Sequence, residues 1–279
     1  MAGQLSLDIG GLAATLEWGP DLGEIRVPEA YRPFVVPGAG GMPIRLNTAG
    51  PRPEPGLAAF DNTPIWALHR SPGGRRFEIF PEYPTLRRTL VVDDALRQAQ
   101  LTFRASDCDP FTGPALELIT ILRLAQRRGL ILHGCGVERN GRGTAFVGVS
   151  GAGKSTLSRL WAAVDGVRIL SDDRLIVRTE ADGLRLYGSP WHGDAQFAAA
   201  GGVPLDRIFF IRHGTGNERT PLRPALVVRE LMCCSFPPYW DPDGMRAGLE
   251  SMVELSALPC EVLDFVPDPT VIDFLLEAA

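Results

Sequence analysis

Short apolar segments that alternate with polar positions fill the first 110 residues of the chain. Alternation with a period of two is typical of strands with one buried face, and the glycines and prolines between the segments are typical of turns. The pattern predicts strands at residues 12–18, 25–27, 44–46, 65–69, 76–80 and 98–103. We therefore expect a β-rich N-terminal domain over residues 1–110.

The pattern changes near Phe111, where the apolar positions take helical spacing. They run from Gly113-Pro114 to Gly129 and predict a helix. Two apolar runs, 130–138 and 143–149, then flank Asn140-Gly141, a strong signal for a β-hairpin. Later segments predict a helix to about residue 163, strands at 167–170, 184–187, 207–212 and 260–265, and helices at 223–235, 245–255 and from 270 onward. Strands alternating with helices imply an α/β domain over residues 111–279, with helices on a central sheet.

Composition narrows the class of protein. Of the 279 residues, 45% are apolar and 22% charged, as in a globular protein with a sizeable core. The net charge of −5 gives no basic surplus to attract nucleic acid or an anionic membrane. The most apolar stretch, 116–125, is too short to span a bilayer, and no charged-then-apolar leader opens the chain. We therefore expect a cytoplasmic protein with no nucleic acid and no membrane among its partners.

The five cysteines are odd in number and lack Cys-x-x-Cys spacing. This usage argues against a disulfide framework and against a zinc site. We expect buried thiols in a reducing compartment.

One lysine stands among the 28 basic residues, and the other 27 are arginine. Lys154 lies in Gly148-Val-Ser-Gly-Ala-Gly-Lys-Ser155, which matches the phosphate-binding pattern G-x-x-x-x-G-K-[ST] between a predicted strand and a predicted helix. In this pattern backbone N–H groups bind phosphate oxygens, the lysine bridges the β- and γ-phosphates, and the serine binds Mg²⁺. The predicted phosphate-binding residues are Gly148, Val149, Ser150, Gly151, Ala152, Gly153, Lys154, Ser155 and Thr156.

Two adjacent carboxylates, Asp172 and Asp173, follow Lys154 by 18 and 19 residues. That distance fits one helix and one short strand, so the pair leaves the carboxyl end of the next strand, where ligands bind in open α/β sheets. Neighbouring residues on an extended chain point to opposite sides, and phosphoryl transfer to a hydroxyl uses both a metal ligand and a base. The structural alternative is a turn or a helix cap.

His133 becomes a candidate through the hairpin geometry. If Asn140-Gly141 is a two-residue turn, residues whose numbers sum to 281 pair across the hairpin, and His133 lies opposite Gly148. This position is beside the phosphates, although a core histidine is the alternative. His192 and Asp194 lie in a later turn, where they either contact metal or substrate or only shape the loop.

The order of these parts resembles the bacterial HPr kinase/phosphorylase family, whose core is related to ATP-dependent phosphoenolpyruvate carboxykinase. The matching elements are His133-Gly134, the loop from Gly148 to Ser155, and Ser171-Asp172-Asp173. Looser agreement at residues 190–193 and 265–274 extends the resemblance to HPr-kinase-related proteins found with ribosomal-peptide clusters, including lasso-peptide tailoring kinases. The resemblance covers about residues 111–279.

The resemblance implies a P-loop kinase core, a mixed sheet flanked by helices, that uses ATP and Mg²⁺ to phosphorylate a serine of a protein or peptide. Lys154 and Ser155 would hold ATP and Mg²⁺, while one of Asp172 and Asp173 would activate the acceptor hydroxyl and the other would hold the metal. No segment resembles the family's Glu-Leu-Arg-Gly signature, and residues 1–110 do not resemble the regulatory domain of the bifunctional enzymes. We therefore expect a one-way kinase for an acceptor other than HPr, with residues 1–110 as a candidate for acceptor recognition.

Two other functions fit the same motifs. A small-molecule kinase would need a compact pocket bounded by the turn at 187–194, whereas a protein kinase would leave an open groove there. A nucleotide-sensing module would use ATP to order its N-terminal part, but it has less need of two acids. The sequence leaves the oligomeric state open, a homo-oligomer included.

Overall fold

The computed structural model describes residues 2–38, 40–48, 58–71, 73–83, 86–103 and 108–277. By the contacts between its residues the chain divides into two compact units, one formed by Met1–Asp8 and Leu12–Arg123 and the other by Ile9–Gly11 and Leu124–Ala279. Each unit holds one mixed β-sheet, of nine strands in the first and eight in the second, and the described residues form five α-helices. The chain is therefore richer in strands than the α/β expectation implied.

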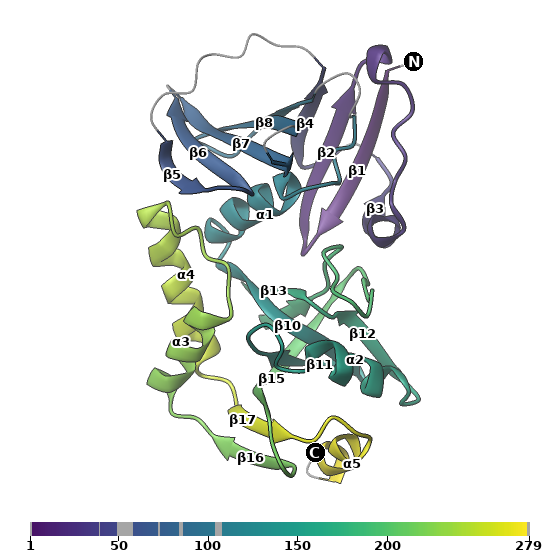
Figure 1. Ribbon diagram of the computed structural model, residues 1–279, viewed down its shortest axis with the longest axis vertical. Helices are drawn as coiled ribbons and strands as arrows, with labels where there is room; N and C mark the ends of the chain where they lie inside the picture. The colour runs from purple at the N-terminus through teal and green to yellow at the C-terminus, as the bar shows by residue number, and fades with distance from the viewer. Residues whose placement is uncertain are drawn as a thin grey trace. The chain divides into compact units, whose positions relative to one another are not determined.

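The first unit is built around its nine-stranded sheet (Figure 1). The strand order is β3 (Val35–Val36), β1 (Gly3–Ile9), β2 (Leu12–Trp18), β4 (Met42–Asn47), β9 (Ala99–Thr102), β8 (Leu86–Asp93), β7 (Gly74–Glu82), β6 (Trp66–Ser71) and β5 (Ala58–Asn62). Strand β4 lies parallel to β2 and β9, and β5 to β9 pair antiparallel. Met42, Ile44 and Leu46 of β4 are buried whereas Arg45 between them is exposed, as a period of two requires. Most of α1 (Ala115–Ala125) belongs to this unit.

Five of the six strands predicted before residue 110 coincide with β2, β4, β6, β7 and β9. The predicted strand at 25–27 is wrong, because these residues lie between two short 3₁₀-helices, Pro20–Leu22 and Glu29–Phe34. Pro28 directly follows the segment, and prolines lack the N–H that a strand ladder needs. The sequence pattern misses β1, β3, β5 and β8.

The sheet of the second unit has the order β11 (Arg142–Val147), β10 (Gly129–Arg139), β13 (Arg174–Glu180), β14 (Gly183–Tyr187), β15 (Gly202–His213), β17 (Cys260–Phe265) and β16 (Glu218–Pro221). Strand β12 (Val167–Ser171) pairs with β10, and β11 also pairs with β15. Strands β11, β15 and β17 are parallel neighbours, and the other pairs are antiparallel.

Strand β10 changes partners at its centre. Its first half, up to His133, pairs with β13, whereas its second half, from Gly134, pairs with β11. Strand β12 pairs with the second half along the other edge. His133-Gly134 therefore lies where three neighbouring strands meet.

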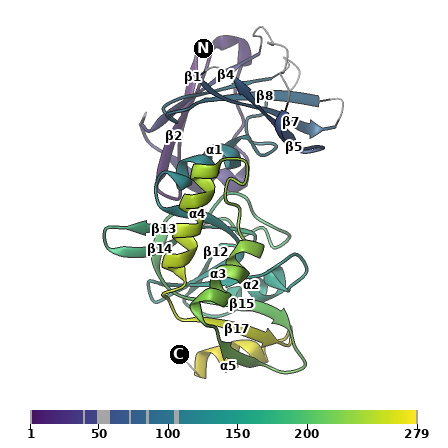
Figure 2. The same cartoon turned by 90° about the vertical axis from the view of Figure 1, so that its left-hand side faces the viewer.

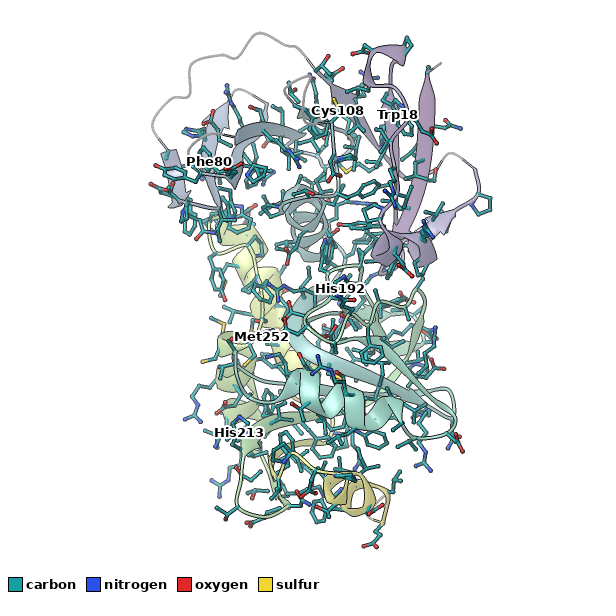
Figure 3. The ribbon with its side chains drawn as sticks, turned by 45° about the vertical axis from the view of Figure 1, so that its right-hand side comes forward. Trp18, Phe80, Cys108, His192, His213 and Met252 are labelled. Carbon is teal, nitrogen blue, oxygen red and sulfur yellow. The ribbon has the colours of Figure 1, made fainter. Side chains whose placement is uncertain are left out.

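Helices cover both faces of this sheet (Figures 1 and 2). One apolar cluster joins the sheet to α3 (Pro224–Cys233) and α4 (Pro242–Leu255), the latter through Met252 (Figure 3). The other joins it to α2 (Lys154–Ala162) and α5 (Thr270–Glu277). Ala145 and Val147 of β11 face the first cluster and Phe146 the second, which is typical of a strand buried on both faces.

The predicted elements of the second unit have observed counterparts, but the pattern misses β13 and β16. The prediction of buried thiols is right for Cys135, Cys234 and Cys260 and wrong for Cys233, which is exposed at the end of α3, and Cys108 is half-buried. In the described part of the chain, no helix has the length and apolar character needed to cross a membrane.

The topology brings several strand ends to one edge. Strand β10 runs antiparallel to both β11 and β12, and β11 runs parallel to β15. The carboxyl ends of β11, β12 and β15 therefore point the same way, and they are followed by the phosphate loop, Asp172-Asp173 and Gly214. Ligands gather at such an edge in α/β sheets.

Candidate functional site

The loop from Gly148 to Ser155 connects β11 to α2 in a conformation that demands glycine. Gly151 and Gly153 have φ angles of 81° and 97°, which residues with a Cβ rarely adopt. A Cβ on Gly148 would lie 2.9 Å from the Cβ of Ala152. The pattern of glycines therefore follows from the loop's own geometry, and the loop ends at the N-terminus of α2, where backbone N–H groups are free to bind an anion.

Lys154 is buried inside this loop rather than extended into solvent. Its Nζ donates to the carbonyl oxygens of Gly148, at 3.0 Å, and Val149, at 2.9 Å. Burial lowers the pKa of Lys154, while the charge of Asp173 acts in the opposite direction. The ammonium is thus held at the centre of the loop by two acceptors that a phosphate can replace.

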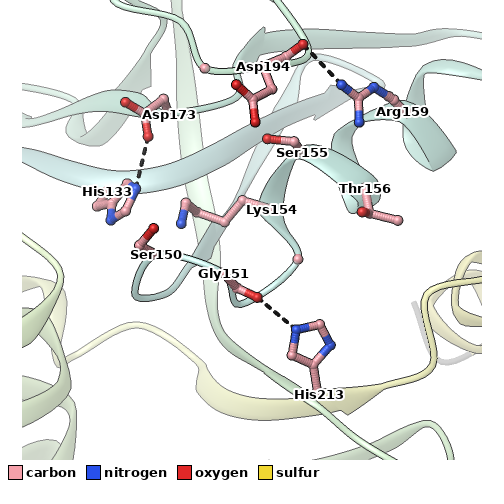
Figure 4. A pocket seen from close by; sticks show the side chains of 12 residues that line it. His133, Ser150, Gly151, Lys154, Ser155, Thr156, Arg159, Asp173, Asp194 and His213 are labelled. Carbon is pink, nitrogen blue, oxygen red and sulfur yellow. Dashed lines mark hydrogen bonds and ion pairs between the residues drawn. The ribbon is translucent and has the colours of Figure 1, made fainter.

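His133 and Asp173 are hydrogen-bonded beside the loop, with 2.8 Å between Nε2 and Oδ1 (Figure 4). Backbone bonds fix both residues: Gly148 N donates to His133 O at 3.1 Å, and Gly134 N donates to Asp173 O at 3.0 Å. The placement of His133 opposite Gly148 is confirmed by this bond and by a register in which Gly134 pairs with Val147.

Asp173 is held in its ionised form. Burial alone would raise its pKa, but the hydrogen bond from His133 and the charges of Arg174 and Lys154 outweigh burial and hold the pKa below its ordinary value. Arg174 donates to Oδ2 of the same carboxylate and lies over the ring of Phe236, 4.2 Å from its centroid. A carboxylate that stays ionised near neutral pH can accept a proton from a substrate.

Asp172 takes a different position from its neighbour. Its buried carboxylate accepts hydrogen bonds from the backbone N–H groups of Gly193, Ala195 and Phe197, at 3.0, 2.7 and 3.2 Å. Asp172 therefore holds the 193–197 segment against the end of β12. The opposite orientations of the two acids agree with the expectation for adjacent residues on an extended chain.

The segment held by Asp172 carries a further carboxylate, Asp194. Arg159 of α2 donates to the backbone oxygen of Asp194 at 3.0 Å, so the segment is fixed from a second side. Figure 4 shows the Asp194 carboxylate directed toward the hydroxyl of Ser155. His192, in contrast, is exposed and contacts the neighbouring Gly193 oxygen at 3.0 Å (Figure 3).

These residues enclose a hollow of about 520 Å³, which we term the loop hollow. Of the residues predicted as site residues, it brings together eight, while Gly148, Val149, Ala152 and Asp172 are not part of its lining. Its lining consists of His133, Ser150, Gly151, Gly153, Lys154, Ser155, Thr156, Arg159, Asp173, Gly193, Asp194 and His213.

Sequence reasoning missed three side chains of the site, Arg159, Arg174 and His213. His213 ends β15, and its Nε2 lies 2.7 Å from the Gly151 oxygen. The only local signals were that Arg174 directly follows the two acids and that His213 directly follows a predicted strand.

The donors in the loop hollow fit Mg²⁺. Ser155, Asp173 and Asp194 offer oxygen ligands, which this hard cation prefers. Among the described residues, no three His, Cys, Asp or Glu side chains come together as a metal-binding group. Such a sparse set is typical of Mg²⁺ sites completed by water and phosphate oxygens.

We expect Asp172→Ala to lower the free energy of unfolding by roughly 3 kcal/mol, because three N–H groups lose their acceptor. Denaturant unfolding measures this change. Asp165→Ala, at an exposed carboxylate after α2, is the matched control and should change the stability little. Equal stability of the two variants would contradict the role of Asp172 in holding the segment.

No protein-family model matches the chain, and a search of curated proteins finds no match.

Proposed function

We propose that this chain is an ATP- and Mg²⁺-dependent kinase that transfers the γ-phosphate to a hydroxyl, preferentially a serine of a protein or peptide. The observation that carries the proposal is the ionised Asp173 beside the buried ammonium of Lys154, in one hollow with the phosphate-binding loop. A binding site for phosphates needs the loop alone, whereas a base facing it is typical of phosphoryl transfer to a hydroxyl.

Several features of the second unit support a kinase core of the HPr kinase/phosphoenolpyruvate carboxykinase type. A hairpin with His133-Gly134 leads into the loop, and the next strand ends in two acids, of which one faces the loop. The mixed sheet lies between two helix layers. No segment of the sequence resembles the family's Glu-Leu-Arg-Gly signature, and residues 1–110 do not resemble the regulatory domain of the bifunctional enzymes. Both departures favour a one-way kinase.

The residues divide the work as follows. The N–H groups of the loop and the Lys154 ammonium bind the phosphates and stabilise charge on the transferring group. The acceptor O–H gives its proton to the Asp173 carboxylate as its oxygen bonds to the γ-phosphorus. The bond from that phosphorus to the bridging oxygen breaks, and ADP leaves with the electron pair. His133 and Arg174 hold the base in place.

In this proposal Ser155 and Asp194 hold Mg²⁺, and Asp173 lines the same hollow as the base. When bound, the metal neutralises phosphate charge. Asp172 acts as a positioning residue, because it fixes the segment that carries Asp194. The first unit remains a candidate for recognising the acceptor, and a cytoplasmic location remains part of the proposal.

Incubation of the purified protein with Mg·ATP and a synthetic mixture of serine peptides tests the function. We expect binding of Mg·ATP by calorimetry and a mass increase of one phosphate on peptides that contain serine. Phosphorylation of small hydroxyl compounds alone would favour a small-molecule kinase. Binding of ATP without any transfer would favour a nucleotide sensor, and no binding would contradict the proposal.

His133→Gln should move the acidic limb of the kcat/KM profile to higher pH. The His133 hydrogen bond and charge lower the pKa of Asp173, so their loss raises it. A smaller fraction of the base is then ionised at a given acidic pH, and the rate falls there first. His192→Gln is the matched control, because His192 is exposed and lies outside the hollow's lining. An unchanged profile for His133→Gln would contradict this coupling.

A further inference from the structure

A second hollow, of about 400 Å³, adjoins the loop hollow and is likewise lined by His133 and Asp173. We term it the acceptor hollow. It shares His133, Ser150 and Asp173 with the loop hollow (Figure 4). Its remaining lining is Val149, Arg174, Cys233, Cys234, Ser235 and Phe236.

The wall formed by residues 234–236 is held firmly on β10. His133 N donates to Cys234 O at 2.8 Å, Phe236 N donates to Ile131 O at 2.9 Å, and Leu132 forms a β-bridge with Ser235. The wall therefore keeps a fixed position relative to the base, because both are tied to the same strand.

Ser235 carries a buried hydroxyl group in this wall. The residue is only 5% exposed, and its Oγ has no hydrogen-bond partner among the described residues. Buried hydroxyls are usually satisfied, so an orphan that lines a hollow points to a missing ligand atom. It is the one side-chain atom of this lining, within the described residues, that is buried without a partner.

The rest of the lining combines polar and apolar groups. Val149 is 56% exposed although it is a large aliphatic residue, and burial raises the pKa of the Cys234 thiol to about 11, so the thiol is neutral. The Phe236 ring is covered by the Arg174 guanidinium. A peptide segment brings one serine hydroxyl between apolar groups, which fits an orphan hydroxyl beside Val149 and Phe236.

We infer that this hollow receives the acceptor, a serine side chain of a peptide with an apolar neighbour, and that Ser235 is a specificity residue that hydrogen-bonds it. The inference rests on the proposed kinase function. The serine hydroxyl then lies against Asp173, which lines both hollows, and faces the phosphates across it. The proton passes to Asp173, and the phosphoryl group passes from ATP to the serine oxygen.

The test uses the full chain, Mg·ATP and a mixture of synthetic peptides with a central serine and randomised flanks. Cys233→Trp fills the mouth of the hollow at an exposed position, and Ser235→Ala removes the hydroxyl. Leu226→Trp, at an exposed position of the same helix outside the hollow, is the matched control. Calorimetry gives the Kd of Mg·ATP, mass spectrometry gives the rate for each peptide, and thermal unfolding confirms that each variant is folded.

We expect Cys233→Trp to lower kcat/KM for the peptides at least tenfold and to leave the Kd of Mg·ATP within about twofold. Ser235→Ala should raise the KM for the peptides about fivefold, the effect of one hydrogen bond, with kcat little changed. Leu226→Trp should match the unchanged protein, and peptides with apolar flanks should be the best acceptors.

Peptide phosphorylation by Cys233→Trp at the unchanged rate would overturn the inference, and so would a parallel loss of Mg·ATP affinity, which would assign the hollow to the nucleotide. Binding of Mg·ATP without phosphorylation of any peptide would overturn the peptide assignment. Failure of the unchanged protein to bind Mg·ATP would instead overturn the kinase proposal itself.

Discussion

Lys154→Arg is expected to lower phosphoryl transfer by about a thousandfold or more, although the positive charge is kept. The ammonium lies between two loop carbonyls at 3.0 and 2.9 Å, and the residue is only 6% exposed. A planar guanidinium is larger and cannot place a single ammonium between two phosphates from so tight a loop. Displacement of the charge that stabilises the transferring group removes a major part of catalysis.

Steady-state rates with Mg·ATP measure this effect, and unfolding curves show whether the variant is folded. Arg142→Lys is the matched exchange in the opposite direction, at an arginine whose side chain is 61% exposed on β11. It should leave the rate within about twofold. Turnover of Lys154→Arg near the unchanged rate would contradict the assignment of the phosphate loop.

Local sequence signals predicted the turn and the register of the hairpin that leads into the loop. Asn140 and Gly141 both adopt positive φ angles, 54° and 73°, as the two-residue hairpin turn requires. The turn fixes the register, so Gly134 pairs with Val147 and Arg139 with Arg142. The two-residue turn thereby places His133 beside the loop. This is the position predicted from the rule that residues whose numbers sum to 281 pair across the hairpin.

The parts that the sequence did not predict depend on contacts between distant residues. Strand β13 begins directly after Asp173 with no glycine or proline before it, so no local signal separates it from β12. The partners of Asp172 lie 21, 23 and 25 residues away. The sequence alone therefore left open which acid faces the loop.

In the first unit, too, the sequence pattern alone does not decide which segments become strands. Residues 25–27 have the apolar alternation of a strand, yet they lie between 3₁₀-helices because prolines occupy positions 20, 28 and 33. Strand β1 has the alternation as well, and it lies between β2, which follows it after Gly10-Gly11, and β3, about 30 positions further along. Periodicity thus indicates which segments can form strands, whereas tertiary pairing decides which of them do.

Substitutions of Asp172 and Asp173 should change different properties of the protein. Asp173→Asn keeps the shape of the side chain but removes the proton acceptor, so we expect kcat to fall by about a hundredfold or more, in the range for general-base catalysis. The Kd of Mg·ATP should change little if Ser155 and Asp194 hold the metal, and the free energy of unfolding should stay close to that of the unchanged protein, because Asp173 is partly exposed.

Asp172→Asn should give the opposite pattern. An amide keeps one acceptor oxygen but turns an NH₂ group toward the 193–197 N–H groups, so the segment loosens and stability falls. Asp194 then loses its position in the lining that it shares with Ser155, and the affinity for Mg·ATP should fall with it. Calorimetry, kcat and unfolding measured on both variants distinguish the roles. Small and equal effects would mean that neither acid takes part in the chemistry, while a large loss of Mg·ATP affinity in Asp173→Asn alone would make Asp173 a metal ligand and not the base.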